Sequence, residues 1–422
     1  MKDIELLRVV TQKQAKEIAS KFGTPIYVYS MALLKKQAEK ALEFPNAYGL
    51  TVRYAMKANS NAAILRFFDE CGIHIDASSG YEAERAMRIG ISPKKILLTS
   101  QQIPYNLKEL VEKGVNYNAC SLYQLEEYGK NFIGGGVSLR LNPGLGSGGT
   151  NRTNTGGPSS SFGIWYKDFD KLLEIAERYQ LKIIRLHTHI GSGSDPKVWK
   201  KVALMSIIYA EKILEAGHDV RILNLGGGYK VGRMNYEKST DLQECGEPIK
   251  QAFINFYKKT GLKLKLEIEP GTFLVANAGC LIAKVIDIKK TSWYNSIIIN
   301  SGMTEVTRPA LYGAQHPITI VPEHKTKNLE TGNYIVYGHC CESGDILTPA
   351  PGNPEALQPR KLLKAEIGDL VVIGGTGAYC SSMCTKNYNS YPDAPEVLID
   401  INNQFKLIKK AQTFKQMLEN EL

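Results

Sequence analysis

Short apolar segments alternate with helix-like segments over much of the chain, and this alternation constrains the fold more than any other feature. Residues 62–68 and 199–216 repeat apolar side chains at helical spacing, and Gly217 closes the second of these segments. The expected strands are 51–56, 73–77, 96–99, 115–119, 137–141, 183–187, 221–225 and 264–268. Eight strands separated by helices are typical of a closed parallel (β/α)8 barrel, whereas an open doubly wound sheet seldom runs to eight evenly spaced units.

After the barrel pattern the sequence changes to strands and turns with few helical segments. The expected strands there are 280–288, 296–299, 318–321, 333–336, 369–372, 397–401 and 404–408. We therefore predict an α/β chain with a barrel at 31–275 and an all-β C-terminal domain at 276–422. Residues 1–30 end in the strand-like segment 26–29, which we expect to join the β domain.

Polar residues and glycines gather directly after the expected barrel strands. Because the carboxyl ends of barrel strands meet at one mouth, where active sites lie, these residues are expected to form a site. An insertion at 144–161 is rich in Gly, Ser and Thr, and its position favours a loop on the substrate side over a disordered linker. The residues that follow the strands are Lys57, Asp76, Asn118, Arg140, His187, His189, Gly191–Gly193, Gly226–Gly228 and Glu269–Gly271.

Lys57 stands where an apolar strand ends, in a turn of small and polar residues. A partly desolvated lysine loses its proton more readily, so it can attack a carbonyl carbon and hold it as a Schiff base. On residues 54–61 alone, a lysine that reaches from the strand end into water is the simpler interpretation. The rest of the sequence decides between the two.

Two glycine-rich turns, at 226–228 and 191–193, give backbone amides free to approach a phosphate, although a tight turn also explains such glycines. A phosphate cradle together with a Schiff-base lysine indicates pyridoxal phosphate. Glu269 would then face the pyridine nitrogen and keep it protonated, unless it is a surface acid. His189 would stack on the ring or fill the core. A zinc pair with His187 lacks a third ligand, so no metal site is predicted.

Charge and cysteine content exclude several classes of function. The net charge is +10, but lysines are spread among acids and no basic block carries interleaved aromatics, so no nucleic-acid partner is predicted. A positive field still favours an anionic substrate or cofactor. We find no signal peptide, no apolar run of the roughly 18 residues that a membrane span needs, and no metal or disulfide spacing among the eight cysteines. A cytoplasmic protein with free thiols is expected.

Seven motifs in order resemble those of diaminopimelate decarboxylase, a family of pyridoxal phosphate enzymes with an alanine-racemase-like barrel and a β domain. The resemblance runs from about residue 20 to 415, and the seven motifs together are specific although each alone is weak. The motifs are Tyr54–Asn59, His187–Ser192, Gly226–Gly228, Glu269–Gly271, Arg308–Tyr312, Cys341–Asp345 and Gly377–Tyr379.

The resemblance implies roles at the matching positions. Lys57 would hold the cofactor as a Schiff base, His189 would stack on its ring, and Glu269 would pair with its nitrogen. Tyr379 would contact both cofactor and substrate. The phosphate would be held by Ser192, Gly226, Gly227, Gly228 and the backbone of 269–272, which includes Gly271 and Thr272.

The resemblance also implies the reaction and the assembly. The reaction would be decarboxylation of meso-2,6-diaminopimelate at its D-centre to L-lysine and carbon dioxide, the last step of lysine biosynthesis. Arg308 and Tyr312 would bind the distal carboxylate. In a homodimer with shared active sites, Cys341 of the neighbouring subunit would donate the proton and Glu342 would bind the distal amine.

One position departs from the family pattern. The family motif is Glu-Pro-Gly-Arg, and its arginine helps to bind the distal carboxylate, whereas this chain has Thr272. Arg308 and Tyr312 would remain, with Arg140 or Arg152 assisting; alternatively the substrate lacks that carboxylate, as D-lysine and D-ornithine do. A non-catalytic relative and a racemase are further alternatives, but the run Cys341–Asp345 favours decarboxylation.

Overall fold

The computed structural model describes residues 4–146, 155–191, 193, 195–324 and 330–422. The chain forms two compact units, which we describe separately. The barrel unit consists of residues 37–230 and 238–273. The β unit combines residues 1–36, 231–237 and 274–422.

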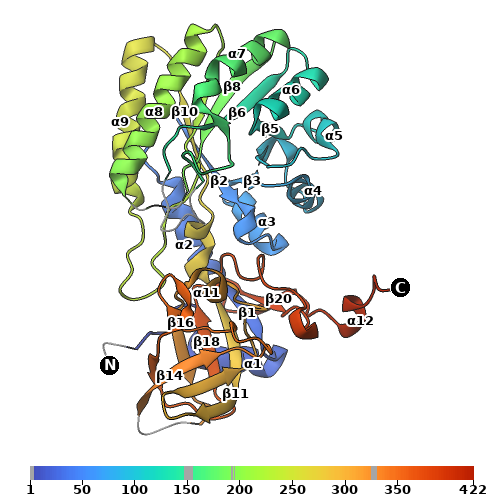
Figure 1. Ribbon diagram of the computed structural model, residues 1–422, viewed down its shortest axis with the longest axis vertical. Coiled ribbons are helices and arrows are strands. Elements are labelled where there is room, and N and C mark those ends of the chain that lie inside the picture. The colour runs from blue at the N-terminus through green and yellow to red at the C-terminus, as the bar shows by residue number, and fades with distance from the viewer. Residues whose placement is uncertain (1–3, 147–154, 192, 194, 325–329) are drawn as a thin grey trace. The chain divides into compact units, whose positions relative to one another are not determined.

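The barrel unit contains a parallel sheet that closes on itself, as predicted. Among the described residues its strand order is β5-β4-β3-β2-β10-β9-β8-β6, and β5 also pairs with β6 to complete the ring (Figure 1). A short strand β7 (Ile164–Trp165) pairs with β6. The ring strands are β2 (Leu50–Ala55), β3 (His74–Ala77), β4 (Ile96–Leu98), β5 (Asn116–Ala119), β6 (Gly136–Asn142), β8 (Lys182–Thr188), β9 (Ile222–Asn224) and β10 (Lys265–Ile268).

Helices follow most of these strands and lie outside the ring (Figure 1). Polar side chains start several of them: Asn61, Ser79 and Ser121 accept hydrogen bonds from first-turn amides. Both faces of the parallel strands are therefore covered, which explains their nearly continuous burial. The helices are α2 (Met31–Leu42, shared with the β unit), α3 (Ala62–Glu70), α4 (Gly80–Arg88), α5 (Leu107–Glu112), α6 (Leu122–Asn131), α7 (Phe169–Arg178), α8 (Pro196–Glu215) and α9 (Leu242–Thr260).

A buried ion-pair network links three strands of the barrel. Glu267 on β10 accepts two hydrogen bonds from Arg53 on β2, at 3.0 and 2.9 Å, and its Oε2 lies 2.9 Å from Nε of Arg185 on β8. Arg53 and Glu267 are 3 and 2% exposed. Two cations and one carboxylate are thus removed from water together, which is favourable only while all three are present.

The β unit is built around the long strand β11 (Gly279–Lys290), which pairs with β1, β12 and β18. Strand β1 (Ile26–Ser30) lies between β11 and β19 and pairs with both, so residues 26–30 are part of the sheet of this unit. Helix α1 (Gln12–Phe22) packs Ala15 and Ile18 into the same core. The further strands are β12 (Asn295–Ile299), β13 (Ile318–Val321), β14 (Thr331–Tyr337), β18 (Leu370–Gly374), β19 (Glu396–Ile399) and β20 (Phe405–Lys409).

Several elements of the β unit were not predicted. Strands β15 (Pro349–Ala350), β16 (Asn353–Leu357) and β17 (Arg360–Leu363) are short and lack the run of β-branched residues that marks a strand. Residues 231–237 also belong to this unit although they lie between two elements of the barrel. Contacts distant in sequence hold them, because Arg8 Nη1 and Asn277 Nδ2 donate to the carbonyls of Arg233 and Gly232 at 2.6 and 2.9 Å.

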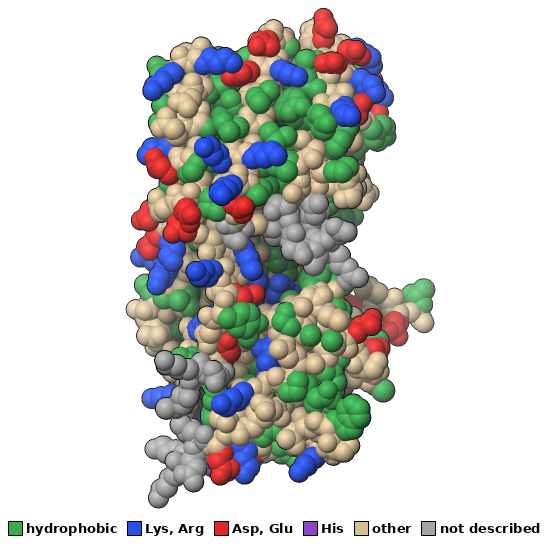
Figure 2. All heavy atoms as spheres, turned by 60° about the vertical axis from the view of Figure 1, so that its left-hand side comes forward, with side chains coloured by type: hydrophobic (Ala, Val, Ile, Leu, Met, Phe, Trp, Pro, Cys, Tyr) green, Lys and Arg blue, Asp and Glu red, His purple; other side chains and the backbone are tan. Residues whose placement is uncertain are grey.

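The described surface carries charges of both signs. Figure 2 shows basic and acidic side chains interspersed on the face that it displays. In the described part of the chain, no helix is both long enough and apolar enough to cross a membrane.

We predict that Glu267→Gln lowers the free energy of unfolding by about 3 to 5 kcal/mol, because it leaves Arg53 and Arg185 buried without a counter-charge. Urea unfolding followed by circular dichroism measures this change. The matched control is Glu174→Gln, which changes an exposed acid on α7 and should alter stability by less than about 0.5 kcal/mol. Equal stability of both variants would show that the network contributes nothing.

Candidate active site

The residues predicted for the site fall into two sets, one in each unit. The barrel unit contains Lys57, His189, Gly226–Gly228, Glu269, Gly271 and Thr272, and the β unit contains Arg308, Tyr312, Cys341, Glu342 and Tyr379. Ser192 and Arg152 lie outside the described residues, as does the part of the predicted insertion at 147–154. We call Lys57, His189, Gly226, Gly227 and Glu269 the barrel site.

Lys57 lies in a single 3-10 turn (Met56–Ala58) at the carboxyl end of β2. Met56 and Ala58 are buried on either side of it, while the Lys57 side chain is exposed within this chain. Gly271 lets this turn approach the end of β10, because a Cβ there would lie 3.2 Å from the Cβ of Ala55 and 3.3 Å from that of Ala58. The positive charge of Lys57 acts on His189 and Asp76.

His189 follows β8 and is held by the glycine turn after β9. The N–H of Gly227 donates to His189 Nδ1 at 3.0 Å, so Nε2 carries the proton of the neutral ring. Burial, aided by the charges of Arg140 and Lys57, lowers the pKa of His189 well below its usual value. His189 is therefore a neutral, fixed, flat ring at neutral pH.

Gly226 and Gly227 have no room for a side chain. A Cβ on Gly226, whose φ is +70°, would lie 2.5 Å from Nδ1 of His189. A Cβ on Gly227 would lie 1.9 Å from the carbonyl oxygen of Glu269. The N–H groups of Gly226 and Gly227 donate to Asn224 Oδ1 and His189 Nδ1 within the barrel. These glycines therefore allow His189 and the end of β10 to approach the backbone closely.

Glu269 extends from the end of β10 and is 6% exposed. Asn224 Nδ2 donates to Glu269 Oε1 at 2.6 Å, and Nε2 of His187 lies 3.3 Å from Oε2. Burial by itself would raise the pKa of Glu269, but the contacts with His187, the nearby His189 and the bond from Asn224 lower it overall. Burial lowers the pKa of His187, so the pair is best described as an ionised Glu269 beside a neutral imidazole.

Asp76 and Arg140 are further members of the site that the motifs did not single out as functional. Asp76 on β3 is 3% exposed, and burial together with the charge of Glu269 raises its pKa well above the usual value. Asp76 Oδ1 and Arg140 Nη2 are buried and have no hydrogen-bond partner among the described residues. Their place at the carboxyl ends of β3 and β6 was the available sequence signal.

The barrel site fits pyridoxal phosphate. Glu269 is an ionised acceptor suited to a protonated pyridine nitrogen, His189 is a neutral ring suited to stacking, and Lys57 supplies an amine at the same end of the barrel. The glycine turn lets His189 and the end of β10 lie against its backbone, because a Cβ on Gly226 or Gly227 would overlap them. Nearby Asp76 and Glu269 have pKa values shifted in opposite directions, a pattern frequent at catalytic sites.

In the β unit, Arg308 begins the short helix α11 (Arg308–Tyr312). Its Nη1 donates to Nε2 of His316 at 2.8 Å, and His316 Nδ1 donates to the carbonyl of Gly374 at 2.9 Å. Burial and the charge of Arg308 lower the pKa of His316 well below its usual value, so this tautomer is neutral. His316, which the sequence analysis missed, therefore orients the guanidinium of Arg308.

Tyr379 and Tyr312 lie within electrostatic range of Arg308. Tyr379 has a backbone φ of 56°, in the left-handed region that a bulky residue seldom adopts. Such backbone conformations persist where the surrounding structure enforces them, and they are concentrated at functional sites. The structure thus brings three of the five predicted residues of the β unit close together.

Cys341 and Glu342 lie on another loop and are both exposed in this chain. The N–H of Cys341 donates to Oδ1 of Asn389 at 2.7 Å, and the hydroxyl of Tyr388 donates to Glu342 at 3.1 Å. Asn389 has a φ of 51°. A second loop in an unusual conformation therefore presents the thiol and the carboxylate to the outside of this chain.

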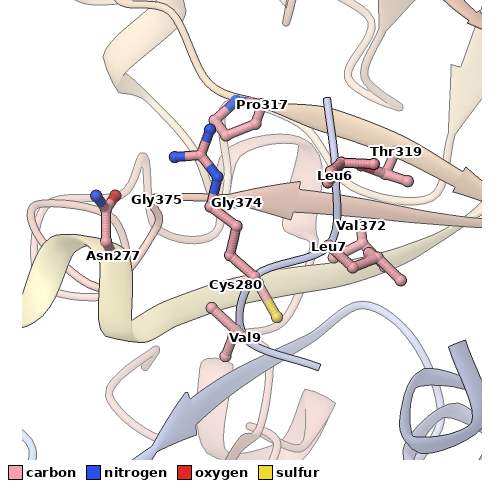
Figure 3. Close-up of a pocket in the computed structure, with 11 residues that line it drawn as sticks. Leu6, Leu7, Val9, Asn277, Cys280, Pro317, Thr319, Val372, Gly374 and Gly375 are labelled. Atoms are coloured by element: carbon pink, nitrogen blue, oxygen red, sulfur yellow. The ribbon is translucent and has the colours of Figure 1, made fainter. Parts of the chain in front are cut away.

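A small cavity in the β unit does not coincide with these residues. Its volume is about 10 Å³, enough for roughly one water molecule, and apolar side chains such as Leu7 and Val372 surround it (Figure 3). It is too small to hold a cofactor or an amino acid.

Comparison with known proteins identifies the family. The family model described as pyridoxal-dependent decarboxylase, pyridoxal binding domain, matches residues 31–276. The diaminopimelate decarboxylase of Escherichia coli K12 is 34% identical over 98% of this chain and 97% of the relative. A crystal structure of diaminopimelate decarboxylase superposes with a TM-score of 0.90 at 35% identity, covering 98% of this chain and 97% of that one.

A Helicobacter pylori diaminopimelate decarboxylase solved in complex with L-lysine is also similar. It has a TM-score of 0.83 and 26% identity, and the comparison covers 96% of this chain and 98% of that one. In both solved structures the likeness extends over the barrel and the β unit together, which confirms the predicted fold class. The chain therefore belongs to the pyridoxal-dependent decarboxylases, and within them to the diaminopimelate decarboxylase family.

Proposed function

We propose that this chain decarboxylates meso-2,6-diaminopimelate at its D-centre, with pyridoxal phosphate as cofactor, to give L-lysine and carbon dioxide. The observation that carries the proposal is the ionised, buried Glu269 beside neutral His189 at the barrel end that bears Lys57. The full-length similarity to diaminopimelate decarboxylases supports it. Such an enzyme is a carboxy-lyase, and the reaction would end lysine biosynthesis.

Each residue of the barrel site has a physical task in this proposal. Bound pyridoxal phosphate supplies the electron sink for the pair released when the bond from Cα to the carboxylate breaks. Lys57 holds the cofactor through Nζ, and Glu269 keeps the pyridine nitrogen protonated. His189 stacks on the ring, while Ser192, Gly228, Gly271 and Thr272 hold the phosphate. The N–H groups of Gly226 and Gly227 already donate to Asn224 and His189, so they are not assigned to the phosphate.

The residues of the β unit are proposed to bind substrate and to deliver a proton. Arg308 and Tyr312 bind the distal carboxylate, and Tyr379 contacts cofactor and substrate. Cys341 of a neighbouring subunit gives the proton of its Sγ to Cα after carbon dioxide leaves, and Glu342 binds the distal amine. Cys341 and Glu342 are exposed in a single chain, which supports the proposal that they contribute to the active site of another subunit.

The alternative substrates D-lysine and D-ornithine lack the distal carboxylate. Thr272 suggested D-lysine or D-ornithine as the substrate. The full-length relatives named above are diaminopimelate decarboxylases, which does not favour these substrates. The retention of both Lys57 and Cys341 argues against a binding protein without activity. We also propose that the homodimer acts in the cytoplasm.

The first test is release of carbon dioxide by the purified protein with pyridoxal phosphate. We expect turnover of meso-diaminopimelate with kcat/KM at least about 100-fold higher than for D-lysine or D-ornithine. When a substrate without the distal carboxylate is bound, the buried cations that bind this carboxylate have no partner. A preference for the monocarboxylic substrates would refute the proposal. Binding of the cofactor without turnover of any substrate would favour the non-catalytic alternative.

Lys57→Ala should lose covalent attachment of the cofactor. After reduction with borohydride, mass spectrometry of the wild-type protein should find the cofactor on the peptide that contains Lys57, and the variant should carry none. Attachment at a different lysine would contradict the assignment.

Glu269→Gln should lower kcat by about 100-fold or more, because a neutral amide no longer stabilises the protonated pyridine nitrogen. Steady-state kinetics on meso-diaminopimelate measure this effect. Glu174→Gln is the matched control and should retain wild-type kcat. A kcat near wild type for Glu269→Gln would remove the role assigned to this carboxylate.

Mixed dimers test whether the sites are shared. Lys57→Ala and Cys341→Ala should each be nearly inactive, but after subunit exchange at equal concentrations about a quarter of wild-type activity should return, since one site of each mixed dimer is intact. Mixing either variant with itself is the control. No recovery despite proven exchange would mean that Lys57 and Cys341 of the same chain act together.

A further inference from the structure

Arg233 is a buried arginine that forms no ion pair with a carboxylate of the described residues. Its side chain is 7% exposed, its Nε donates to the carbonyl of Gly375 at 3.0 Å, and its Nη2 has no hydrogen-bond partner among the described residues. The nearby Glu237 forms no ion pair with it among the described residues, because Glu237 Oε2 accepts the backbone N–H groups of Arg233 and Met234, although its charge still acts on Arg233. A buried guanidinium with an unused donor is a costly feature.

Arg308 lies within electrostatic range of Arg233 and shares its anchoring. The carbonyl of Gly374 holds His316, which accepts from Arg308, and the next carbonyl, of Gly375, holds Arg233. Gly375 has a φ of +66°, and a Cβ there would lie 2.9 Å from Cγ and Cδ of Arg233. The end of β18 is therefore shaped to hold two guanidinium groups, which we call the arginine pair.

The arginine pair is a positive centre with no ion-pair partner in the described part of the chain. Burial, followed by the charge of Arg308, lowers the pKa of Arg233 to about 9, so Arg233 remains charged at neutral pH. Burial also lowers the pKa of Arg308, whose Nη1 donates to the neutral His316. No ion pair to either arginine occurs among the described residues, and the charge of nearby Glu237 acts on both, so an anion from outside would relieve the remaining repulsion.

We propose that Arg233 is a second substrate-binding arginine, which with Arg308 grips the distal carboxylate of diaminopimelate. It would replace the arginine that the family has at the position of Thr272, and the inference rests on the proposed function. A carboxylate suits the arginine pair because its two oxygens can accept from two planar guanidinium groups, and charge-assisted bonds of this kind are about twice as strong as neutral ones.

The test compares Arg233→Gln with Arg8→Gln in the purified holoenzyme. Arg8 Nη1 donates to the carbonyl of Arg233, so Arg8→Gln loosens the same segment but keeps the guanidinium of Arg233. For Arg233→Gln we expect KM for meso-diaminopimelate to rise roughly 30-fold or more, with kcat changed less than about 3-fold. The kcat/KM for D-lysine should be nearly unchanged, so the preference for the dicarboxylic substrate falls. Arg8→Gln should keep that preference.

A second measurement separates binding from folding. Pimelate, which has carboxylates at both ends, should inhibit the wild-type enzyme competitively, and Arg233→Gln should weaken that inhibition about as much as it raises KM. Arg233→Lys, which keeps a charge but lacks the fork of donors, should fold and give intermediate values.

The outcomes are distinct. A wild-type enzyme that does not decarboxylate meso-diaminopimelate would refute the proposed function itself. A wild-type enzyme that does so, with unchanged KM and pimelate inhibition in Arg233→Gln, would overturn the inference alone. Equal losses for both substrates in Arg233→Gln and Arg233→Lys would also overturn it, since that result indicates a purely structural role.

Discussion

The ionised carboxylate of Glu269, held inside a closed barrel, is the interaction on which the rest of the site depends. Removing a carboxylate from water is unfavourable unless hydrogen bonds and charges compensate. Asn224 and His187 provide this compensation from strands β9 and β8, and Asn224 also lies 3.4 Å from Glu267. The site is thus continuous with the ion-pair network that links β2, β8 and β10.

The compensation also fixes the state of the other groups. Burial and the negative charge of Glu269 raise the pKa of Asp76, and burial together with the positive charges of Arg140 and Lys57 lowers the pKa of His189. The glycine turn contributes by its lack of side chains, since Gly226 lets His189 lie against the backbone and Gly227 lets the β9 turn touch the end of β10. One buried charge, two glycines and a fixed imidazole together prepare a surface for a cationic aromatic ring.

The β unit uses a different arrangement. There two arginines are supported by backbone carbonyls and a neutral histidine, and no acid of the described residues pairs with them. A barrel end that keeps a negative charge for the cofactor nitrogen and a β unit that keeps a positive charge for a substrate carboxylate are complementary halves of the proposed chemistry. In this proposal the exposed Cys341 and Glu342 act in the active site of the neighbouring subunit. The proposal therefore requires a dimer.

Much of this could be predicted from the sequence, because the determining signals are local. Alternation of apolar strands and helices gave the barrel order, strand-end placement gave Lys57, His189 and Glu269, and seven motifs gave the family. Short strands such as β16 and β17 were missed because they carry no local signal of their own. Protonation states and the arginine pair depend on burial and on contacts between distant segments, such as Arg8 with residue 233 and His316 with residue 374. Only the tertiary structure decides these, because the free energy of a buried charge depends on everything packed around it.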